Sequence, residues 1–337
     1  MRQGETVATR LECAFLEGDA LADWDALVER VPTGTIFHSN RWTEIIAGAF
    51  ARRARVLGVF RNGVLIAGAP LYERRTAGLV IANPPVVAGY AGALLDLPEY
   101  ERMSRSISEG EQILGALEAG VRERYGYARL THPPSIADAR PFMWGGWRVG
   151  PRFTYRIAPG NPDEIFAAIE HNARKKIRRA EDAGLVVQPT TTTEEIISAY
   201  EASYRRHDTP APVPIARLGA LADHLLGAGI ARGFVVRAAD GAVHAFKIQV
   251  YDGRATYAWI AGNVPEHMAD GGFSLLTWRI LSDTFESNRV YDFLGANTPT
   301  IARFKRAFGG DLVHYWETTH TTRFARAIFR IRGVIRR

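Results

Sequence analysis

A lysine next to an aromatic residue, near the carboxyl end of the chain, is the pair best suited to chemistry. Phe304 and Lys305 lie in the segment 291–310, which reads Tyr-Asp-Phe-Leu-Gly-Ala-Asn-Thr-Pro-Thr-Ile-Ala-Arg-Phe-Lys-Arg-Ala-Phe-Gly-Gly. A lysine ammonium can stabilise the charge that develops on a carbonyl oxygen under attack, and an aromatic ring can hold an apolar part of a ligand. The pair therefore suits an anionic or carbonyl-bearing substrate. A core phenylalanine beside a solvated lysine explains the same spacing.

The residues around this pair predict the elements that hold it. Residues 290–294 predict a short strand followed by a glycine turn. Thr298 and Pro299 predict the N-cap and the first position of a helix that carries the pair, with Arg303 beside it. Two consecutive glycines are expected to end this helix. The pair is thus expected at a strand-to-helix junction late in an α/β chain.

The densest positive charge lies at residues 174–179, which read Arg-Lys-Lys-Ile-Arg-Arg. On a helix, Arg174 and Arg178 share one face and Lys175 lies on the next. Cationic groups arranged in this way can bind the phosphates of a nucleotide or of an RNA backbone. A solvated basic helix explains the same run of residues.

Gly271 and Gly272 precede a predicted helix at about 272–287. Glycines at the amino terminus of a helix expose backbone N–H groups to an anion, so this pair is a weak candidate for phosphate binding. The nine histidines show no His-Glu-x-x-His motif and no paired ligand spacing, and the chain has no P-loop or Rossmann glycine pattern. The sequence therefore predicts neither a bound metal nor a dinucleotide cofactor.

The composition is that of a folded protein with a mild positive charge. Of 337 residues, 47% are hydrophobic and 23% are charged, and the net charge is +6. This excess permits anionic partners without requiring them. Cys13 is the single cysteine, which excludes an intramolecular disulfide and a multi-cysteine metal site. The amino terminus has no signal-peptide pattern and no apolar run is long enough to span a bilayer, so the expected compartment is the cytoplasm.

Residues 323–337 carry arginines among Phe, Ile and Val at near-helical spacing. A segment of this kind can lie on a membrane surface or bind RNA. Packing against the body of the protein, with the arginines in water, is the simpler explanation. Peripheral contact with the inner face of the membrane is left open.

The chain shows one order of elements twice. Hairpins that turn at Asn62-Gly63 and Asp240-Gly241 are each followed by an amphipathic helix and then by a short strand. We predict an α/β (α+β) fold of two tandem domains, each with a mixed central sheet flanked by helices. Two unrelated α+β domains would also give this order. The predicted divisions are a first domain at 1–150, a second at 151–321 and a basic amphipathic tail at 322–337.

Three motifs give the chain a resemblance to a known family. Tyr-Asp-Phe-Leu-Gly followed by Phe-Lys-x-x-Phe-Gly-Gly, over 290–311, resembles the FemABX family, which are double-GNAT-fold transferases that add amino acids from aminoacyl-tRNA to peptidoglycan precursors. Asn-x-Arg-x-x-Ile-Arg-x-Ala at 172–180 is similar to the basic helix of that family. Phe-His-Ser-x-x-Trp at 37–42 is similar to its amino-terminal entry motif.

The first half departs from the family pattern. Ile46 stands four residues after Trp42, at the position where peptidoglycan enzymes have a lysine for the UDP phosphates. Asn83-Pro84-Pro85 replaces the Arg-Gly-Pro of the family, and the coiled-coil arm of some members is missing from the sequence. This half is more similar to the CelD-like acyltransferases, so a UDP-linked muramyl acceptor is not implied.

The resemblance implies acyl or aminoacyl transfer to an amine, with formation of an amide and without a covalent enzyme intermediate. Lys305 would stabilise the oxyanion, and Asp292 would accept the proton of the amine, a step that the substrate itself can also perform. The expected donor contacts are Phe304, Asn297, Gly271, Gly272 and Arg303. The expected phosphate or acceptor contacts are Arg174, Lys175, Arg178, Trp42 and Tyr90.

Aminoacyl-tRNA is the expected co-substrate and acyl-CoA is the alternative. The expected acceptor is an amine of a peptide or of a cell-wall or natural-product precursor, whereas a small amine or amino sugar suits the CoA alternative. A hypothesis from a different class is an inactive GNAT-like scaffold that binds an anionic polymer or a membrane through the basic tail. No resident cofactor is expected, and the oligomeric state is left open.

Overall fold

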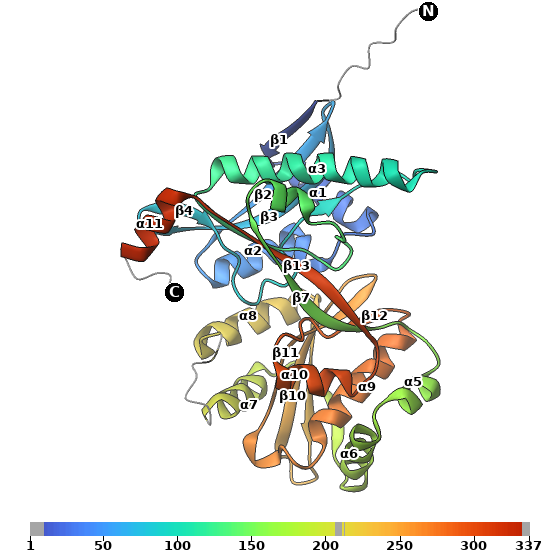
Figure 1. Ribbon diagram of the computed structural model, residues 1–337. Helices are drawn as coiled ribbons and strands as arrows, with labels where there is room; N and C mark the ends of the chain where they lie inside the picture. Colours follow the sequence, from blue (N-terminus) through green and yellow to red (C-terminus); the bar gives the residue numbers. More distant parts are fainter. Residues whose placement is uncertain (1–9, 206–210, 212, 332–337) are drawn as a thin grey trace, which may run out of the picture. The chain divides into compact units, whose positions relative to one another are not determined.

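The computed structural model describes residues 10–205, 211 and 213–331 (Figure 1). The chain divides into two compact units. The first comprises Met1–Pro151 together with Tyr315–Arg337, and the second comprises Arg152–His314. The segment from Tyr315 onward therefore belongs to the first unit, whereas the sequence predicts it in the second domain and the tail.

The first unit contains a sheet with the strand order β1-β2-β3-β4-β6-β13, in which β5 also pairs with β3. Most neighbours are antiparallel, but β4 and β6 are parallel where Ala82 pairs with Ala128, and the chain between them forms the long helix α3. The elements of this unit are β1 (Leu11–Phe15), α1 (Ala20–Arg30), η1 (Ile36–His38), α2 (Asn40–Ala49), β2 (Arg53–Arg61), β3 (Val64–Thr76), β4 (Leu79–Ala82), β5 (Leu94–Leu95), α3 (Met103–Arg124), β6 (Tyr127–Thr131), α4 (Arg140–Trp144), α11 (Arg323–Ile331) and part of β13 (Asp311–Thr321).

The second unit contains a sheet with the order β7-β12-β11-β10-β9-β8. Again one neighbouring pair is parallel, here β11 with β12, and helix α9 forms the crossover between these two strands. The elements are the main part of β7 (Arg148–Ile157), α5 (Pro162–Ala168), α6 (His171–Asp182), β8 (Val186–Thr190), α7 (Thr193–Arg205), α8 (Ile215–Gly227), β9 (Ala231–Arg237), β10 (Val243–Tyr251), β11 (Ala255–Asn263), η2 (Pro265–His267), α9 (Gly272–Glu286), β12 (Val290–Asp292) and α10 (Pro299–Arg306).

The predicted fold class and the repeated order of elements are confirmed. In each unit an antiparallel hairpin is followed by a helix and then by a strand that joins the sheet in parallel. The hairpin between β2 and β3 turns at Asn62 and Gly63, whose φ angles are +50° and +79°. Positive φ at both central residues is the geometry of the tight turn that matches the strand twist, so the Asn-Gly signal has a direct physical cause.

Two helix starts agree with the caps that the sequence predicts. Pro299 is the first residue of α10 and Thr298 is its N-cap, although the Thr298 side chain makes no capping hydrogen bond. The sequence also predicts Ser39 as an N-cap, and its Oγ accepts a hydrogen bond from the backbone N–H of Trp42 at the start of α2. Residues 162–184 predict a helix with or without a break; the structure has a break between α5 and α6, and Gly184 follows α6 with a φ of +71°. Residues 193–207 predict a further helix, of which α7 covers Thr193–Arg205 and the last two residues lie outside the described part of the chain.

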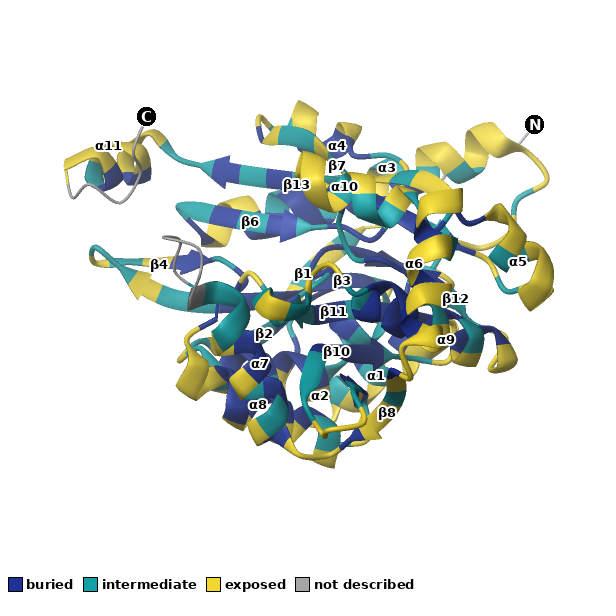
Figure 2. Ribbon diagram, turned by 90° about the horizontal axis from the view of Figure 1, so that it is seen from below, coloured by how far each residue is buried: buried dark blue, intermediate teal, exposed yellow. Residues whose placement is uncertain are grey.

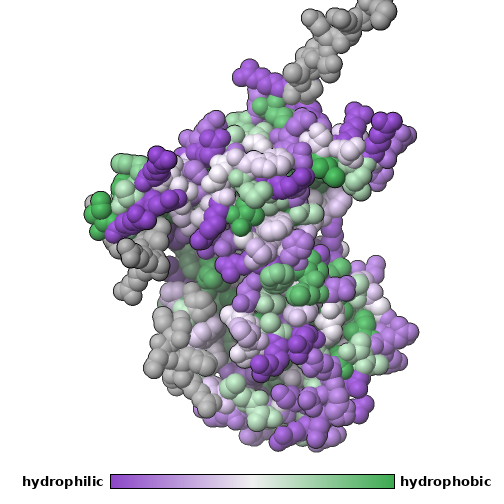
Figure 3. Space-filling model, in the orientation of Figure 1, coloured by the Kyte–Doolittle hydropathy of each residue, from purple (hydrophilic) through white to green (hydrophobic). Residues whose placement is uncertain are grey.

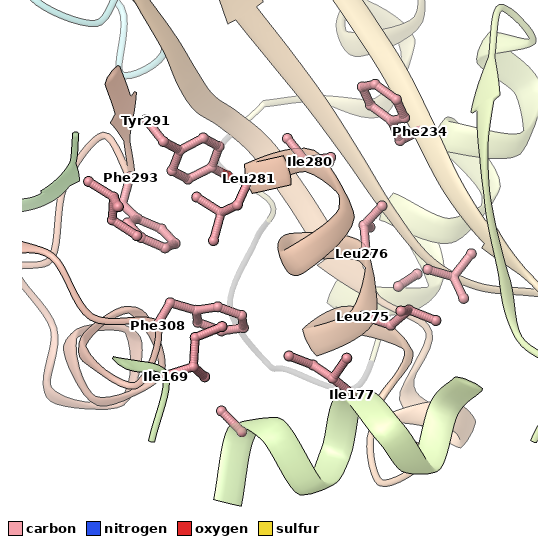
Figure 4. Packing of buried hydrophobic residues seen from close by; sticks show 14 of the residues in the cluster. Ile169, Ile177, Phe234, Leu275, Leu276, Ile280, Leu281, Tyr291, Phe293 and Phe308 are labelled. Carbon is pink, nitrogen blue, oxygen red and sulfur yellow. The ribbon is translucent and has the colours of Figure 1, made fainter. Parts of the chain in front are cut away.

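The core of the second unit forms where α6 and α9 pack against the sheet (Figure 4). Ile177 on α6 and Leu276 on α9 are fully buried, and Phe308 joins them from the segment after α10. Burial of one such aliphatic side chain contributes roughly 1.5–3 kcal/mol, so these contacts fix α6 to the sheet. The charged residues of α6 lie on its outer side, and buried positions elsewhere concentrate in the strands (Figure 2).

Helix α11 is the described part of the predicted tail. Its Ala325 and Phe329 are buried against Ile81, and the Phe329 ring meets the Tyr127 ring edge-to-face at 5.7 Å. Phe324 and Ile331 remain 68% and 84% exposed, next to exposed arginines. Packing against the body is thus confirmed for one side of this helix, while residues 332–337 lie outside the described range. None of the described helices is long and apolar enough to cross a membrane.

A lysine lies inside the core of the second unit. Lys247 on β10 is 2% exposed, and its Nζ donates to the Thr277 Oγ1 at 3.0 Å and to the Tyr291 hydroxyl at 3.3 Å. Burial, and secondarily the positive charge of Lys305, lowers the pKa of Lys247 to about 7. A buried amine without a carboxylate in contact, among the described residues, destabilises the fold whenever it is protonated.

We predict that Lys247→Met stabilises the protein by about 1–4 kcal/mol at pH 7, because it removes a buried cation and keeps the side-chain volume. The unfolded lysine keeps its proton up to its ordinary pKa of 10.5, while the folded lysine loses it near pH 7. The unfolded state therefore binds more protons between these values, and the stability of the wild type rises with pH across this window. Denaturant unfolding at pH 7 and pH 9 should show a smaller rise for the variant.

Lys176→Met is the matched control, because Lys176 is exposed on α6 and the same substitution there should change stability by less than about 0.5 kcal/mol. A loss of stability in Lys247→Met at pH 7 would contradict the account of Lys247 as a destabilising buried cation.

Candidate active site at the end of strand β12

The Lys305 ammonium lies against the chain that follows β12. Its Nζ donates to the carbonyl oxygens of Phe293 at 2.6 Å and of Gly295 at 2.5 Å. Burial lowers the pKa of Lys305 to about 8, and the negative charge of Asp292 acts in the opposite direction. Lys305 is therefore not the solvated lysine of the alternative explanation. It is a mostly buried cation held by two carbonyl groups.

A closed set of hydrogen bonds fixes those carbonyl groups. The Asp292 Oδ1 accepts from the Leu294 N–H and from the Thr154 hydroxyl, both at 2.8 Å, and the Gly295 N–H donates to the Thr154 Oγ1 at 3.1 Å. Leu294 and Gly295 both have positive φ angles, +52° and +102°, which turn the chain back after the strand. The turn presents its carbonyl oxygens to Lys305.

Asp292 itself is fully buried, and the Arg156 Nε lies 3.5 Å from its Oδ2. The bonds from Thr154 and Leu294 and the nearby Arg156 guanidinium fix this carboxylate in place. These contacts give Asp292 a role in positioning the turn, and its role as base remains a prediction.

Phe304 is half-buried between two other rings. Its centroid lies 5.0 Å from that of Phe273, at the start of α9, and 5.1 Å from that of Phe308. The Nζ of Lys247 lies 5.1 Å from the Phe273 centroid on the core side. Phe304 thus contributes to the core and also remains partly accessible beside Lys305, so the two explanations for the pair both hold in part.

Two further predicted donor contacts lie on or near α10. Arg303 is exposed. The Asn297 side chain bonds to β7, where its Oδ1 accepts from the Phe153 N–H at 2.9 Å and its Nδ2 donates to the Phe153 carbonyl at 3.4 Å. Asn297 therefore anchors the loop before α10.

The glycine pair before α9 has a packing role. Gly271 has a φ of +92°, and a Cβ built on it would lie 2.1 Å from the Lys176 carbonyl oxygen, so no other residue fits this approach of α9 to α6. The N–H of Gly272 donates to the Asp270 Oδ1 at 2.7 Å. This N–H is therefore already occupied, which weakens the predicted phosphate cradle at this position.

The basic residues of α6 line a hollow of about 690 Å³ on the surface of the second unit. Arg174, Lys175 and Arg178 all contribute to it, as predicted from their spacing, and Phe166 forms an apolar wall with the Arg178 guanidinium 5.9 Å from its ring centroid. Asp163 and Asp182 also line the hollow, so the charge is not uniformly positive.

The hollow adjoins the helix that carries Lys305. The Glu170 N–H, at the start of α6, donates to the Ala307 carbonyl at 2.8 Å, and the Arg306 Nε lies 3.3 Å from the Glu170 Oε1. The end of α10 is thus bonded directly to the beginning of α6. A ligand with phosphates on α6 and a reactive group at Lys305 would extend across this junction.

Trp42 and Tyr90 belong to the first unit and are almost fully buried, at 0% and 2% exposure. The Trp42 Nε1 donates to the Ala88 carbonyl at 3.1 Å, and the Phe37 ring packs edge-to-face on both Trp42 and Tyr90. The structure does not bring these two residues together with Lys305 in one unit. Their predicted contact with an acceptor remains a prediction.

Sequence reasoning missed Lys247, Thr154 and Arg156. Lys247 had a recognisable signal, because it interrupts the apolar run Ala-Phe-Lys-Ile-Gln-Val of a predicted strand. Thr154 and Arg156 lie more than 130 residues before Asp292 in the sequence, and only the pairing of β7 with β12 brings them to it. No local pattern could have identified them.

Comparison with known proteins agrees with this geometry. Residues 168–306 match the acetyltransferase (GNAT) domain family. The crystal structure of FemX is similar with a TM-score of 0.69 at 14% identity, over 94% of this chain and 99% of that chain. No curated protein sequence matches the chain.

Two further solved structures share the fold. A tandem GNAT protein from the clavulanic acid biosynthesis pathway has a TM-score of 0.54 at 15% identity, over 92% of this chain and 98% of that chain. L-PGS from Bacillus licheniformis has a TM-score of 0.53 at 11% identity, over 95% of this chain and 98% of that chain. The resemblance found in the motifs therefore agrees with these comparisons: residues 168–306 match an acetyltransferase (GNAT) domain family, and the chain shares the fold of FemX and of a tandem GNAT protein over most of its length.

Proposed function

We propose that this protein transfers an aminoacyl group from aminoacyl-tRNA to an amine of a peptide or of a cell-wall or natural-product precursor. The observation that carries the proposal is the buried Lys305 ammonium at the end of β12. An ammonium has three N–H donors, and two of them bond to the Phe293 and Gly295 carbonyl groups. No third acceptor bonds to this ammonium among residues 10–205, 211 and 213–331, so its third donor can bind a ligand oxygen.

The chemistry is nucleophilic attack on an activated ester. The neutral acceptor amine attacks the carbonyl carbon, a C–N bond forms, and the carbonyl electron pair moves to the oxygen. Lys305 stabilises this oxyanion, and its partly buried position strengthens the interaction because water screens it less. Collapse of the intermediate breaks the ester C–O bond and releases the ribose oxygen of the tRNA as an alkoxide. The attacking nitrogen loses its proton, which this alkoxide can accept to become a hydroxyl. Phe304 forms the apolar wall beside the reacting ester.

Two observations support aminoacyl-tRNA as the donor. The hollow is lined by three neighbouring cations, Arg174, Lys175 and Arg178, which suit the successive phosphates of an RNA backbone. The N–H of Gly272 is occupied by Asp270, so the start of α9 offers less to the pyrophosphate of a CoA donor. Acyl-CoA is the alternative donor, supported by the match of 168–306 to acetyltransferase (GNAT) domains and by the similar tandem GNAT structure.

The first unit bears on which acceptor the protein uses. Ile46 is fully buried, so the position where peptidoglycan enzymes have a phosphate-binding lysine is part of the core here. A small or peptide amine without a UDP group therefore suits this protein better than a UDP-linked precursor.

We predict that Lys305→Ala lowers kcat by about 100- to 1,000-fold, the effect of removing one oxyanion donor. The wild-type rate should also fall as the pH rises through about 8, because Lys305 then loses its proton. Deprotonation of the acceptor amine acts in the opposite direction, which gives a bell-shaped profile. Lys305→Arg keeps its charge at these pH values, so any residual activity should lack the alkaline limb near pH 8.

Initial rates of the wild type and of each variant are measured at several pH values between about 6 and 10. Thermal unfolding of each variant confirms that it is folded. A folded Lys305→Ala variant with wild-type rates would exclude Lys305 as the oxyanion donor.

The donor is identified by incubating a lysate that contains the protein with a labelled amino acid, with and without RNase. We predict that RNase abolishes incorporation and that added acyl-CoA does not restore it. With purified protein, Arg178→Glu should weaken binding of charged tRNA and flatten its dependence on salt, because one phosphate contact is lost. Lys176→Glu makes the same charge change on α6 outside the hollow and is the control. Incorporation that survives RNase and requires acyl-CoA would favour the alternative donor.

A second candidate function is binding of an anionic membrane surface through α11. Arg323, Arg326 and Arg330 are exposed on this helix beside the exposed Phe324 and Ile331, and it carries no acidic residue. Figure 3 shows hydrophobic and hydrophilic surface side by side at this helix. Basic and apolar side chains in this arrangement suit the interface of an anionic bilayer.

We predict that the protein cosediments with vesicles containing anionic lipid and not with neutral vesicles. Phe324→Ser together with Ile331→Ser should reduce this binding several-fold without loss of stability, since Ala325 and Phe329 keep the helix packed. Val64→Ser, at another exposed apolar position of the same unit, is the control. Cosedimentation that RNA competes away and the double substitution leaves unchanged would assign the basic residues of α11 to RNA.

A further inference from the structure

Two histidines and an aspartate from separate elements meet before helix α9. His244 comes from β10, His267 ends η2, and Asp270 follows three residues later. The His244 Nδ1 lies 2.6 Å from the Asp270 Oδ2, and the His267 Nδ1 lies 3.9 Å from the same oxygen. The two imidazole rings are stacked, with centroids 3.5 Å apart and an angle of 3° between their planes. One potential ligand atom from each of the three residues therefore lies within 4.8 Å of the other two.

The turn before α9 explains only part of this cluster. The Asp270 Oδ1 accepts from the Gly272 N–H two residues later, at 2.7 Å, and its Oδ2 contacts His244, which accounts for one histidine. The His267 ring makes no hydrogen bond to any described residue; it stacks on His244, and its Nδ1 lies 3.9 Å from the Asp270 Oδ2. The turn formed by Asp270 does not require this second imidazole.

We propose that His244, His267 and Asp270 form a binding site for a divalent transition-metal ion of the zinc class. Imidazole nitrogens and one carboxylate oxygen are the donor set that such ions prefer. Bond lengths of about 2.0–2.2 Å in a tetrahedral site require ligand atoms roughly 3.3 Å apart. The two separations from the Asp270 Oδ2, 2.6 Å and 3.9 Å, lie on either side of this distance. A metal ion would have to draw the His267 nitrogen closer to this oxygen and move the His244 nitrogen slightly away from it.

The surroundings suit an ion with an open position. The Gly272 N–H orients the carboxylate of Asp270 from behind, as groups around metal ligands do. The side chains of His244, Asp270 and His267 are 11%, 25% and 32% exposed, so solvent or a ligand oxygen can take the fourth position.

A bound ion would join β10, η2 and the loop that leads into α9. With one carboxylate among the ligands it would keep a net positive charge, so the fourth position would favour an oxygen anion. The proposal does not depend on acyl transfer, because binding of the ion is measured without substrate.

The test is isothermal titration of tag-free protein with Zn²⁺, with Mg²⁺ as the hard-ion comparison. We expect one Zn²⁺ per chain with micromolar or tighter affinity and no measurable binding of Mg²⁺. His267→Ala and Asp270→Asn should each weaken Zn²⁺ binding by at least about 10-fold. His224→Ala is the matched control, because His224 is an exposed histidine on α8 in the same unit and its loss should leave the affinity unchanged.

Co²⁺ absorption and thermal unfolding distinguish loss of the metal site from loss of the fold. Co²⁺ in place of Zn²⁺ should give visible absorption bands of a tetrahedral site in the wild type, and His267→Ala should lose them. The partly exposed position of His267 makes this variant tolerable for the fold, which thermal unfolding without metal checks. Absence of Zn²⁺ binding by the wild type, or equal binding by His267→Ala and Asp270→Asn, would overturn the proposal.

Discussion

The hydrogen bonds that close the turn after β12 are the constraint on which the proposed active site depends. Asp292 and Thr154 hold the N–H groups of Leu294 and Gly295, and the turn then presents two carbonyl oxygens to the Lys305 ammonium. The turn has to use left-handed backbone at two consecutive residues to do this. A cation in this place would be costly without these partners, because burial favours the neutral amine. The same partners leave one N–H of the ammonium for a ligand.

The second unit has two lysines in or beside its core, and burial lowers the pKa of both. Lys305 lies at the edge of the core and Lys247 within it, and the charge of Lys305 opposes protonation of Lys247. The Phe273 ring lies 5.1 Å from the Lys247 Nζ and 5.0 Å from the Phe304 ring, whose residue neighbours Lys305 in the sequence. Interior polar groups that reduce stability are typical of sites kept for function. The charge adds to that of the basic hollow on α6, to which the end of α10 is bonded.

Much of the fold could be predicted from local patterns. The Asn62-Gly63 turn, the Ser39 cap and the order of hairpin, helix and strand all arise from short-range chemistry that a single sequence shows. Phe304 and Lys305 could be chosen because a strand end, a proline and a glycine pair surround them. What could not be predicted depends on tertiary contacts: the pairing of β7 with β12 brings Thr154 to Asp292, and the course of the loop after β11 brings Asp270 to His244. The occupied N–H of Gly272 likewise appears only when Asp270 is placed.

The central claim is that the Lys305 ammonium contacts the carbonyl oxygen of the transferred group. The most direct measurement is a crystal structure with a hydrolysis-resistant donor analogue, in which an amide links an amino acid to the 3′ position of adenosine. The account predicts that the carbonyl oxygen of the analogue lies about 3 Å from the Lys305 Nζ, beside Phe304. An analogue bound elsewhere, with Lys305 still bonded only to Phe293 and Gly295, would contradict it.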